Sequence, residues 1–419
     1  MRKTTNFFEF KDSQLYAEDV KVTDLAKEFG TPLYVYSKAT IERHLNAFEN
    51  ALASKKHLTC FAVKSCSNLA VLNLLAKLGA GFDIVSEGEL RRVIAAGGDP
   101  KKVVFSGVGK TEAEIEYALS VGINCLNIES EEEIDAVIKV AKKLNVVAPV
   151  ALRVNPGVDP KTHPYISTGL KNNKFGVSEE IALELYQRLA KEPCLKVSGI
   201  DCHIGSQMTD AAPIIEASEK IVNLYQKLLA LGIKVDHIDM GGGLGVTYDK
   251  EVPPQPLDYY APILEKLSGY DVALYIEPGR AMIANSSVLL AKVLYQKNNG
   301  DKHFVITDTG MNDMIRPALY GAYMTIENAV DHKDVAPVVC DVVGPICESD
   351  DFLGKERSLK VKNGDILAVR GAGAYGSSMS STYNTRRLPC EVMVDGKNAT
   401  VIKKRQSFED IWKDECILN

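Results

Sequence analysis

Short apolar runs and longer amphipathic stretches alternate regularly through the first two thirds of the chain. Eight runs have the length and composition of buried strands: Leu58–Val63, Gly81–Val85, Val103–Ser106, Cys125–Ile128, Val147–Val154, Val197–His203, Val235–Met240 and Val272–Ile276. The stretches between them show helical spacing: Asn68–Leu78, Gly88–Ala96, Thr111–Val121, Glu131–Leu144, Ser178–Ala190, Ala212–Leu231 and Pro256–Leu267. Because parallel strands need crossover helices and eight of them close a barrel, the pattern predicts an α/β fold with a (β/α)8 TIM barrel. A doubly wound open sheet is the alternative, and eight even units fit it less well.

The alternation of strand-like and helical stretches ends at about Ser286, and the strand-like runs that follow are joined mostly by turns. Asp395-Gly396, ahead of Lys397, is typical of a β-hairpin. These runs therefore predict a second, mostly antiparallel β-barrel domain. The short β-like pieces near the start of the chain are expected to belong to the same domain. We expect the barrel to occupy residues 37–285 and the β-domain to comprise residues 1–36 and 286–419. The long loop 155–177 is expected to act as a lid.

Composition narrows the possible partners. The chain has 419 residues, of which 46% are hydrophobic, and a net charge of −6, which argues against nucleic acid because no basic excess exists to neutralise phosphates. The nine cysteines show no metal-like spacing and fit poorly with a disulfide framework. No apolar run is long enough to cross a bilayer, and Met1–Asn6 leads into no signal-like segment. We expect a cytoplasmic protein with no metal and no membrane partner.

Candidate chemistry follows the predicted strands, whose carboxyl ends meet at one face of a barrel. Lys64 follows the first strand, and an amine that is partly desolvated there can condense with a carbonyl. Taken alone, a lysine is more often a solvated surface charge. His203 ends the sixth strand, where its flat ring could stack on a planar ligand or simply be a satisfied core histidine.

Two further motifs lie at the same rim. Gly241-Gly242-Gly243 follows the seventh strand and lets backbone N–H groups approach an anion, with help from Ser206, or is only a tight turn. Glu277-Pro278-Gly279-Arg280 follows the eighth strand and offers a carboxylate and a guanidinium, either for one ligand or for an ion pair with each other. A carboxylate can keep a pyridine nitrogen protonated, and an arginine can hold a phosphate. Together these groups fit pyridoxal 5′-phosphate, which has an aldehyde, a phosphate and a basic ring nitrogen.

These motifs, with others further along, resemble the alanine-racemase-like class of pyridoxal-phosphate enzymes over nearly the whole length. Within this class, which includes the ornithine, lysine and arginine decarboxylases, the resemblance is greatest to the diaminopimelate decarboxylase family. The matching segments are Phe61–Lys64, His203–Gln207, Gly241–Gly245, Glu277–Arg280, Arg316–Tyr320, Gly344–Asp350 and Gly373–Gly376. Many relatives carry an alanine at the position of Ser65. This difference hardly weakens the resemblance, because the neighbouring lysine itself is present.

The resemblance implies roles for the barrel residues. Lys64 would hold the cofactor as a Schiff base, His203 would stack on its ring and Glu277 would pair with its pyridine nitrogen. Its phosphate would be bound by Ser206, by the glycine loop and by Arg280. Pro278 and Gly279 would also bind the cofactor.

The resemblance also implies a substrate, meso-2,6-diaminopimelate, which loses one carboxyl group to give L-lysine and carbon dioxide. Arg280 would reach the substrate together with Arg316 and Tyr320, which hold the carboxylate at its far end, and Tyr375 would touch both cofactor and substrate. Cys347 and Glu348 would come from the partner subunit of a head-to-tail homodimer, Cys347 returning a proton to Cα, a role that Lys64 could also take, and Glu348 recognising an ammonium group. Without its matching neighbours, Cys347 would read as a small buried hydrophobe.

Three other functions stay open at this point. A decarboxylase of ornithine, arginine or a polyamine precursor looks similar as far as Arg280, but it binds a distal cation, which Arg316 would repel. An alanine-racemase-type activity would need a second catalytic base in place of the residues that bind the distal carboxylate. A non-catalytic cofactor-binding relative would be expected to lack Lys64 or Cys347, and both are present.

Overall fold

The computed structural model describes residues 6–159 and 173–418. The chain forms two compact units, and we describe each by itself. The barrel unit comprises His44–Val246 and Glu251–Met282, and the β unit comprises the chain up to Arg43, Thr247–Lys250 and the chain from Ile283. Most of the loop 155–177, expected as a lid, lies outside the described residues.

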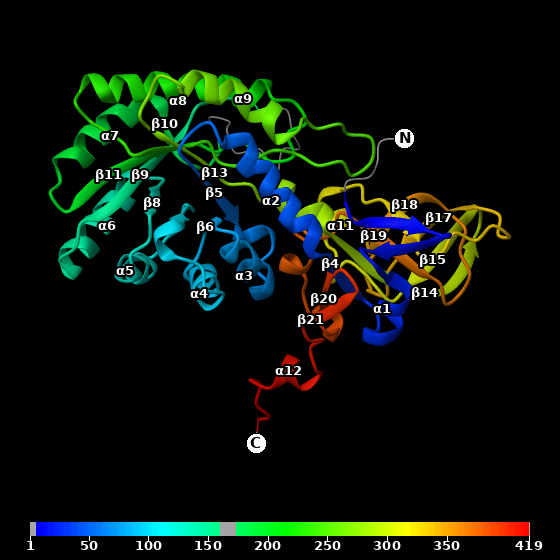
Figure 1. Cartoon of the computed structure of the whole chain (residues 1–419). Coiled ribbons are helices and arrows are strands. Elements are labelled where there is room, and N and C mark those ends of the chain that lie inside the picture. Colours follow the sequence, from blue (N-terminus) through cyan, green and yellow to red (C-terminus); the bar gives the residue numbers. More distant parts are fainter. Residues whose placement is uncertain (1–5, 160–172, 419) are drawn as a thin grey trace. The chain divides into compact units, whose positions relative to one another are not determined.

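The barrel unit is built on a closed sheet of parallel strands (Figure 1). Its strands are β5 (His57–Ala62), β6 (Gly81–Ile84), β7 (Val103–Phe105), β8 (Cys125–Ile128), β9 (Ala148–Asn155), β11 (Leu195–Asp201), β12 (His237–Asp239) and β13 (Ala273–Ile276). β13 pairs with β5, and β8 pairs with β9, so the eight strands close into a ring. The two-residue β10 (Val177–Ser178) adds to β9. The fold is therefore the expected (β/α)8 barrel.

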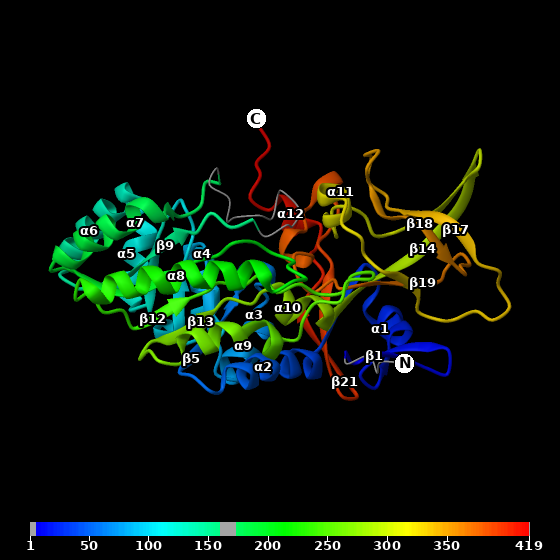
Figure 2. The same cartoon turned by 90° about the horizontal axis from the view of Figure 1, so that it is seen from above.

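Helices follow the strands and cover the outside of the sheet, as the view in Figure 2 shows for α7, α8 and α9. They are α2 (Lys38–Leu52), which precedes β5, and then α3 (Leu69–Lys77), α4 (Glu87–Ala95), α5 (Glu112–Val121), α6 (Glu131–Leu144), α7 (Glu179–Lys191), α8 (Ala212–Ala230), α9 (Pro256–Leu267) and the short α10 (Arg280–Ile283). Both ends of α6 carry residues that are typical of helix caps. Ser130 caps its first turn by accepting from the Glu133 N–H, and Asn145 ends it in the left-handed conformation.

The β unit is organised around the long strand β14 (Ser287–Asn299). Its sheet runs in the order β18-β17-β15-β14-β4-β20-β21, with β19 also paired to β14 and β16 paired to β19. These strands are β4 (Leu33–Ser37), β15 (Lys302–Thr307), β16 (Ile326–Asn328), β17 (Val338–Val343), β18 (Phe352–Leu359), β19 (Ile366–Arg370), β20 (Cys390–Asp395) and β21 (Asn398–Lys403). All pairings are antiparallel except β15 with β17 and β4 with β20, so the unit is mostly antiparallel, as expected.

Smaller elements complete the β unit. They are β1 (Phe8–Lys11), β2 (Gln14–Ala17), β3 (Val20–Lys21), α1 (Val22–Phe29), α11 (Arg316–Tyr320) and α12 (Glu409–Trp412). Apolar side chains from β2, α1, β4, β14 and β20 share one core, including Leu15, Leu25, Leu33, Leu290 and Val392. The predicted hairpin is present, because β20 and β21 pair from Asp395 and Asn398 outwards across a two-residue turn.

Five short elements of the β unit were not predicted from the sequence, namely β3, β16, β18, α11 and α12. β18 reads FLGKERSL, in which charged side chains interrupt the apolar pattern, and the five-residue α11 is too short to show helical periodicity. Across residues 6–159 and 173–418, every helix falls short of the length and apolar character that spanning a bilayer requires.

Candidate functional site

Lys64 lies in a 3-10 turn, Val63–Ser65, directly after β5. Its Nζ donates to Asp83 Oδ2 at 2.6 Å, and the Asp83 side chain is fully buried at the end of β6 while that of Lys64 is 38% exposed. Lys64 is therefore held by a buried carboxylate and is not a freely solvated surface charge. The sequence analysis missed Asp83. The feature that could have identified Asp83 is an acidic residue inside the otherwise apolar strand Gly-Phe-Asp-Ile.

The glycine loop after β12 packs so closely that side chains would not fit. A Cβ on Gly242 would lie 2.2 Å from the carbonyl oxygen of Glu277, and one on Gly241 would lie 2.6 Å from His203 Nδ1. Gly243 has φ +110°, in the region that favours glycine. The loop thus holds bare backbone against the residues that follow β11 and β13, as an anion-binding loop requires.

His203 faces this loop. Its Nδ1 accepts a hydrogen bond from the Gly242 N–H at 3.2 Å, so that nitrogen carries no proton. Burial, together with the positive charges of Arg153 and Lys64, holds the pKa of His203 well below its usual value. The imidazole is therefore neutral, in the form suited to stacking on a planar ring.

Arg280 and Ser206 meet beside the loop. Nε and Nη2 of Arg280 donate to Ser206 Oγ at 3.3 and 3.2 Å, and Arg280 is buried at the start of α10. A guanidinium and a hydroxyl at this spacing can bind one phosphate group together.

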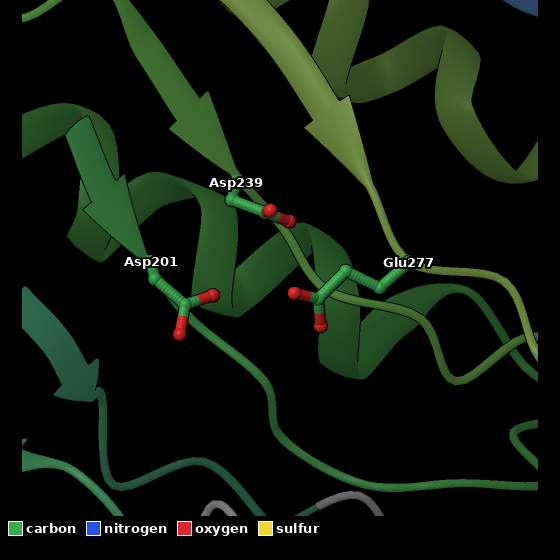
Figure 3. A group of neighbouring side chains, drawn as sticks. All are labelled: Asp201, Asp239 and Glu277. Atoms are coloured by element: carbon green, nitrogen blue, oxygen red, sulfur yellow. The ribbon is translucent and has the colours of Figure 1, made fainter. Parts of the chain in front are cut away.

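Glu277 is part of a buried acidic group (Figure 3). Carboxyl oxygens of Asp201, Asp239 and Glu277, at or just after the ends of β11, β12 and β13, lie within 4.8 Å of one another. Burial raises the pKa of all three, to about 7 for Asp201, and nearby carboxylates raise those of Asp239 and Glu277 further. Within the described residues, Glu277 Oε1 is buried without a hydrogen-bond partner. The group could hold a cation or face a cationic ligand.

Charge of the opposite sign lies beside the acidic group. Arg153, at the end of β9, pairs with Glu129 at 3.1 Å, and its charge opposes the rise in the pKa of Asp201. Glu129 also accepts from the N–H groups of Gly107 and Gly176, which ties three loops together. Sequence analysis missed Arg153, Asp201 and Asp239, although each is a charged residue in a buried strand.

The residues of the barrel unit fit pyridoxal phosphate. Lys64 offers an amine, and the Gly241–Gly243 loop with Ser206 and Arg280 offers donors for a phosphate. Glu277 offers a protonated ring nitrogen a buried oxygen that has no hydrogen-bond partner in the described part of the chain. His203 supplies a neutral flat ring.

The remaining candidate residues lie in the β unit. Arg316 begins α11, is buried, and donates from Nη1 to Tyr248 Oη at 2.8 Å, with its guanidinium 4.8 Å from the centre of the Tyr248 ring. Tyr320 ends the same helix four positions later, so both side chains leave one face. A buried guanidinium held by a tyrosine hydroxyl suits a carboxylate ligand.

Cys347, Glu348 and Tyr375 also belong to the β unit. Cys347 and Glu348 are exposed in the loop between β17 and β18, where Tyr383 donates its hydroxyl hydrogen to Glu348 Oε1. Tyr375 has φ +56°, an uncommon conformation for a tyrosine, between Ala374 and Gly376. Such conformations are often found at functional sites.

Comparisons with known proteins agree with this chemistry. Residues 38–284 match the family described as "Pyridoxal-dependent decarboxylase, pyridoxal binding domain". Fold and site together define a barrel decarboxylase that uses pyridoxal phosphate.

Relatives narrow the class further. The diaminopimelate decarboxylase of Haemophilus influenzae is 54% identical over 414 residues, covering 99% of this chain and 100% of that protein, and that of Pseudomonas aeruginosa is 53% identical over 98% and 99%. A crystal structure of diaminopimelate decarboxylase from Helicobacter pylori complexed with L-lysine superposes with a TM-score of 0.91 at 44% identity, covering 94% of this chain and 99% of that one. This chain belongs to the diaminopimelate decarboxylase family.

Proposed function

We propose that this protein catalyses the pyridoxal-phosphate-dependent decarboxylation of meso-2,6-diaminopimelate to L-lysine and carbon dioxide, the last step of lysine biosynthesis. The observation that carries the proposal is the 54% identity to a diaminopimelate decarboxylase along the full chain. The lysine-bound structure of a relative supports L-lysine as the product.

In this proposal the barrel, residues 37–285, binds the cofactor. Lys64 would hold the cofactor through its amine, which Asp83 keeps in position. Glu277 would pair with the ring nitrogen, and His203 would stack on the ring as a neutral imidazole. Ser206, the glycine loop and Arg280 would bind the phosphate, and Pro278 and Gly279 would also contact the cofactor. When bound, the cofactor supplies an acceptor for the electron pair left by the departing carboxyl group.

Residues 1–36 and 286–419 supply the substrate contacts. Arg316 and Tyr320, together with Arg280 of the barrel, bind the distal carboxylate, Tyr375 contacts cofactor and substrate, and Glu348 binds the distal ammonium group. Cys347 carries a thiol that can return a proton to Cα, and the Lys64 amine is the second possible donor. The carboxyl group that leaves belongs to the D centre, since the product is L-lysine.

The protein is proposed to act as a head-to-tail homodimer in the cytoplasm. Cys347 and Glu348 are exposed in the isolated chain, which supports their contribution to the active site of a partner subunit. Each active site would then be complete only in the dimer.

Specificity separates this proposal from ornithine or arginine decarboxylation. Those substrates end in a cation, and a buried guanidinium such as Arg316 would repel it. Arg316 therefore favours diaminopimelate, whose distal end carries a carboxylate.

The test is carbon dioxide release from meso-diaminopimelate, L-ornithine and L-arginine in parallel, with pyridoxal phosphate added. Wild type should act on diaminopimelate alone, and Arg316→Ala should lose that activity. Arg91→Ala, which removes an exposed arginine from α4, is the control and should behave like wild type. Turnover of ornithine or arginine by wild type would contradict the proposed substrate but not the proposed cofactor site.

A further inference from the structure

The loop that carries Cys347 and Glu348 is held firmly at its base. Asp351, itself buried, accepts from the Ile346 N–H through Oδ2 and from the Met311 N–H through Oδ1, each at 2.6 Å. A Cβ on Gly344 would lie 2.6 Å from Asp351 Oδ2. These contacts fix the chain as far as Ile346 and do not reach the side chains at the tip of the loop.

The tip is held by two consecutive residues of another segment. The Cys347 N–H donates to Asn384 Oδ1 at 3.1 Å, and the Tyr383 hydroxyl donates to Glu348 Oε1. The hydrogen bond from the phenol raises the pKa of Tyr383, so the hydroxyl keeps its proton and remains a donor. Each of the two candidate site residues therefore has its own hydrogen-bond partner.

The backbone of this second segment is unusual. Asn384 and Thr385 have φ of +55° and +56°, and a β-branched residue is particularly disfavoured there. The surroundings impose the conformation: the Ser381 N–H donates to the Asn312 carbonyl at 2.9 Å, and Arg386 Nη2 donates to the Asp308 carbonyl at 2.9 Å. A conformation imposed against local preference directs Asn384 towards Cys347.

We propose that Tyr383 and Asn384 are positioning residues that hold Glu348 and Cys347 in the orientation the substrate requires. The inference rests on the proposed function, which gives Cys347 and Glu348 their roles. The bond from Tyr383 occupies one carboxylate oxygen of Glu348, so Oε2 is the oxygen that would accept from the distal ammonium group. The bond to Asn384 fixes the Cys347 backbone and with it the path of the thiol to Cα.

The effect on Glu348 is tested by Tyr383→Phe, which removes only the hydroxyl. The KM for meso-diaminopimelate should rise about 10-fold, as expected for one hydrogen bond to a charged group, while kcat stays close to wild type. Inhibition by L-lysine, which retains the distal ammonium group, should weaken to a similar extent. Tyr295→Phe, at an exposed tyrosine of β14, is the control and should change neither value.

The effect on Cys347 is tested by a matched pair. Asn384→Gly accepts the left-handed backbone but lacks the acceptor oxygen, whereas Asn384→Asp keeps an acceptor. Asn384→Gly should lower kcat several-fold with little change in KM, and Asn384→Asp should restore it. Asn145→Gly replaces another left-handed asparagine, at the end of α6, and should have no effect.

Thiol reactivity gives a readout independent of turnover. In a Cys416→Ser background, which removes the other exposed thiol, alkylation of Cys347 by iodoacetamide should be several-fold faster in Asn384→Gly than in Asn384→Asp, because the loop tip is released. Equal alkylation rates, or Tyr383→Phe and Asn384→Gly kinetics that match the controls, would overturn the inference. Wild type that leaves diaminopimelate unchanged would instead overturn the proposed function, and the alkylation experiment would still decide whether Asn384 holds the loop.

Discussion

Lys64 Nζ lies 2.6 Å from Asp83 Oδ2, and the two residues come from the ends of neighbouring strands of the barrel. The carboxylate is buried and the ammonium group is partly exposed. A partly exposed lysine next to a buried counter-charge remains within reach of an incoming aldehyde while its position is fixed. Asp83 thus links the fold of the barrel to its chemistry.

Asp83→Asn tests this link. Removing the charge leaves the lysine without its counter-ion and should lower the free energy of unfolding by about 1–3 kcal/mol, measured by urea denaturation. Asp236→Asn breaks a pair of equal length, 2.6 Å to Lys196, that is exposed on both sides, and it should cost less than about 1 kcal/mol. Equal losses in the two variants would show that burial of Asp83 adds nothing.

Glu277→Gln should preserve the cofactor's attachment and abolish most of the turnover. The amide removes the negative charge that would keep the ring nitrogen protonated, so kcat should fall on the order of 100-fold. The absorbance of bound cofactor and the rate of carbon dioxide release separate the two effects. Glu265→Gln, at an exposed position on α9, should match wild type in both, and an active Glu277→Gln would contradict the role given to Glu277.

The acidic group makes stability depend on pH. Burial raises the folded pKa of Asp201 to about 7, so the folded state binds more protons than the unfolded state between about pH 4 and pH 7, and stability falls as pH rises through this window. Asp201→Asn removes the titrating carboxyl group. Between pH 5 and pH 7, cofactor-free wild type should therefore lose roughly 2 kcal/mol more than the variant in urea denaturation.

The control for this pH effect is Asp236→Asn, whose carboxylate is exposed. Its stability should follow wild type across the same range of pH. If the free energy of unfolding changed equally with pH in wild type and in Asp201→Asn, the result would contradict a raised pKa at Asp201.

Gly242→Ala should damage the cofactor site. The added Cβ would lie 2.2 Å from a backbone oxygen of Glu277, which cannot move without shifting the end of the eighth strand. Pyridoxal phosphate should bind at least about 10-fold more weakly, a loss that absorbance titration measures. Gly269→Ala is the matched control, because no atom of the described residues lies within 4 Å of the added Cβ. Unchanged cofactor affinity in Gly242→Ala would rule out a close-packed loop.

Much of the barrel could be predicted because its signals are local. Each strand is short, apolar and bounded by polar residues, and α6 and α9 begin and end where the hydrophobic spacing predicts. Strand β18 could not be predicted, because its alternation is broken by charges and its place is set by pairing with β17. Residues after the strands were recognised as candidates because a barrel brings all strand ends to one face.

The sequence by itself determined the order of most elements, the barrel class and the candidate residues for the chemistry, since periodicity and motifs are properties of neighbouring positions. Only the tertiary structure decided which charges meet. Asp83 faces Lys64, Asp201 and Asp239 face Glu277, and Tyr383 holds Glu348. These pairs join residues that are far apart along the chain, and the free energy of a buried or shared charge depends on distances that exist only after the strands have closed and the loops have packed.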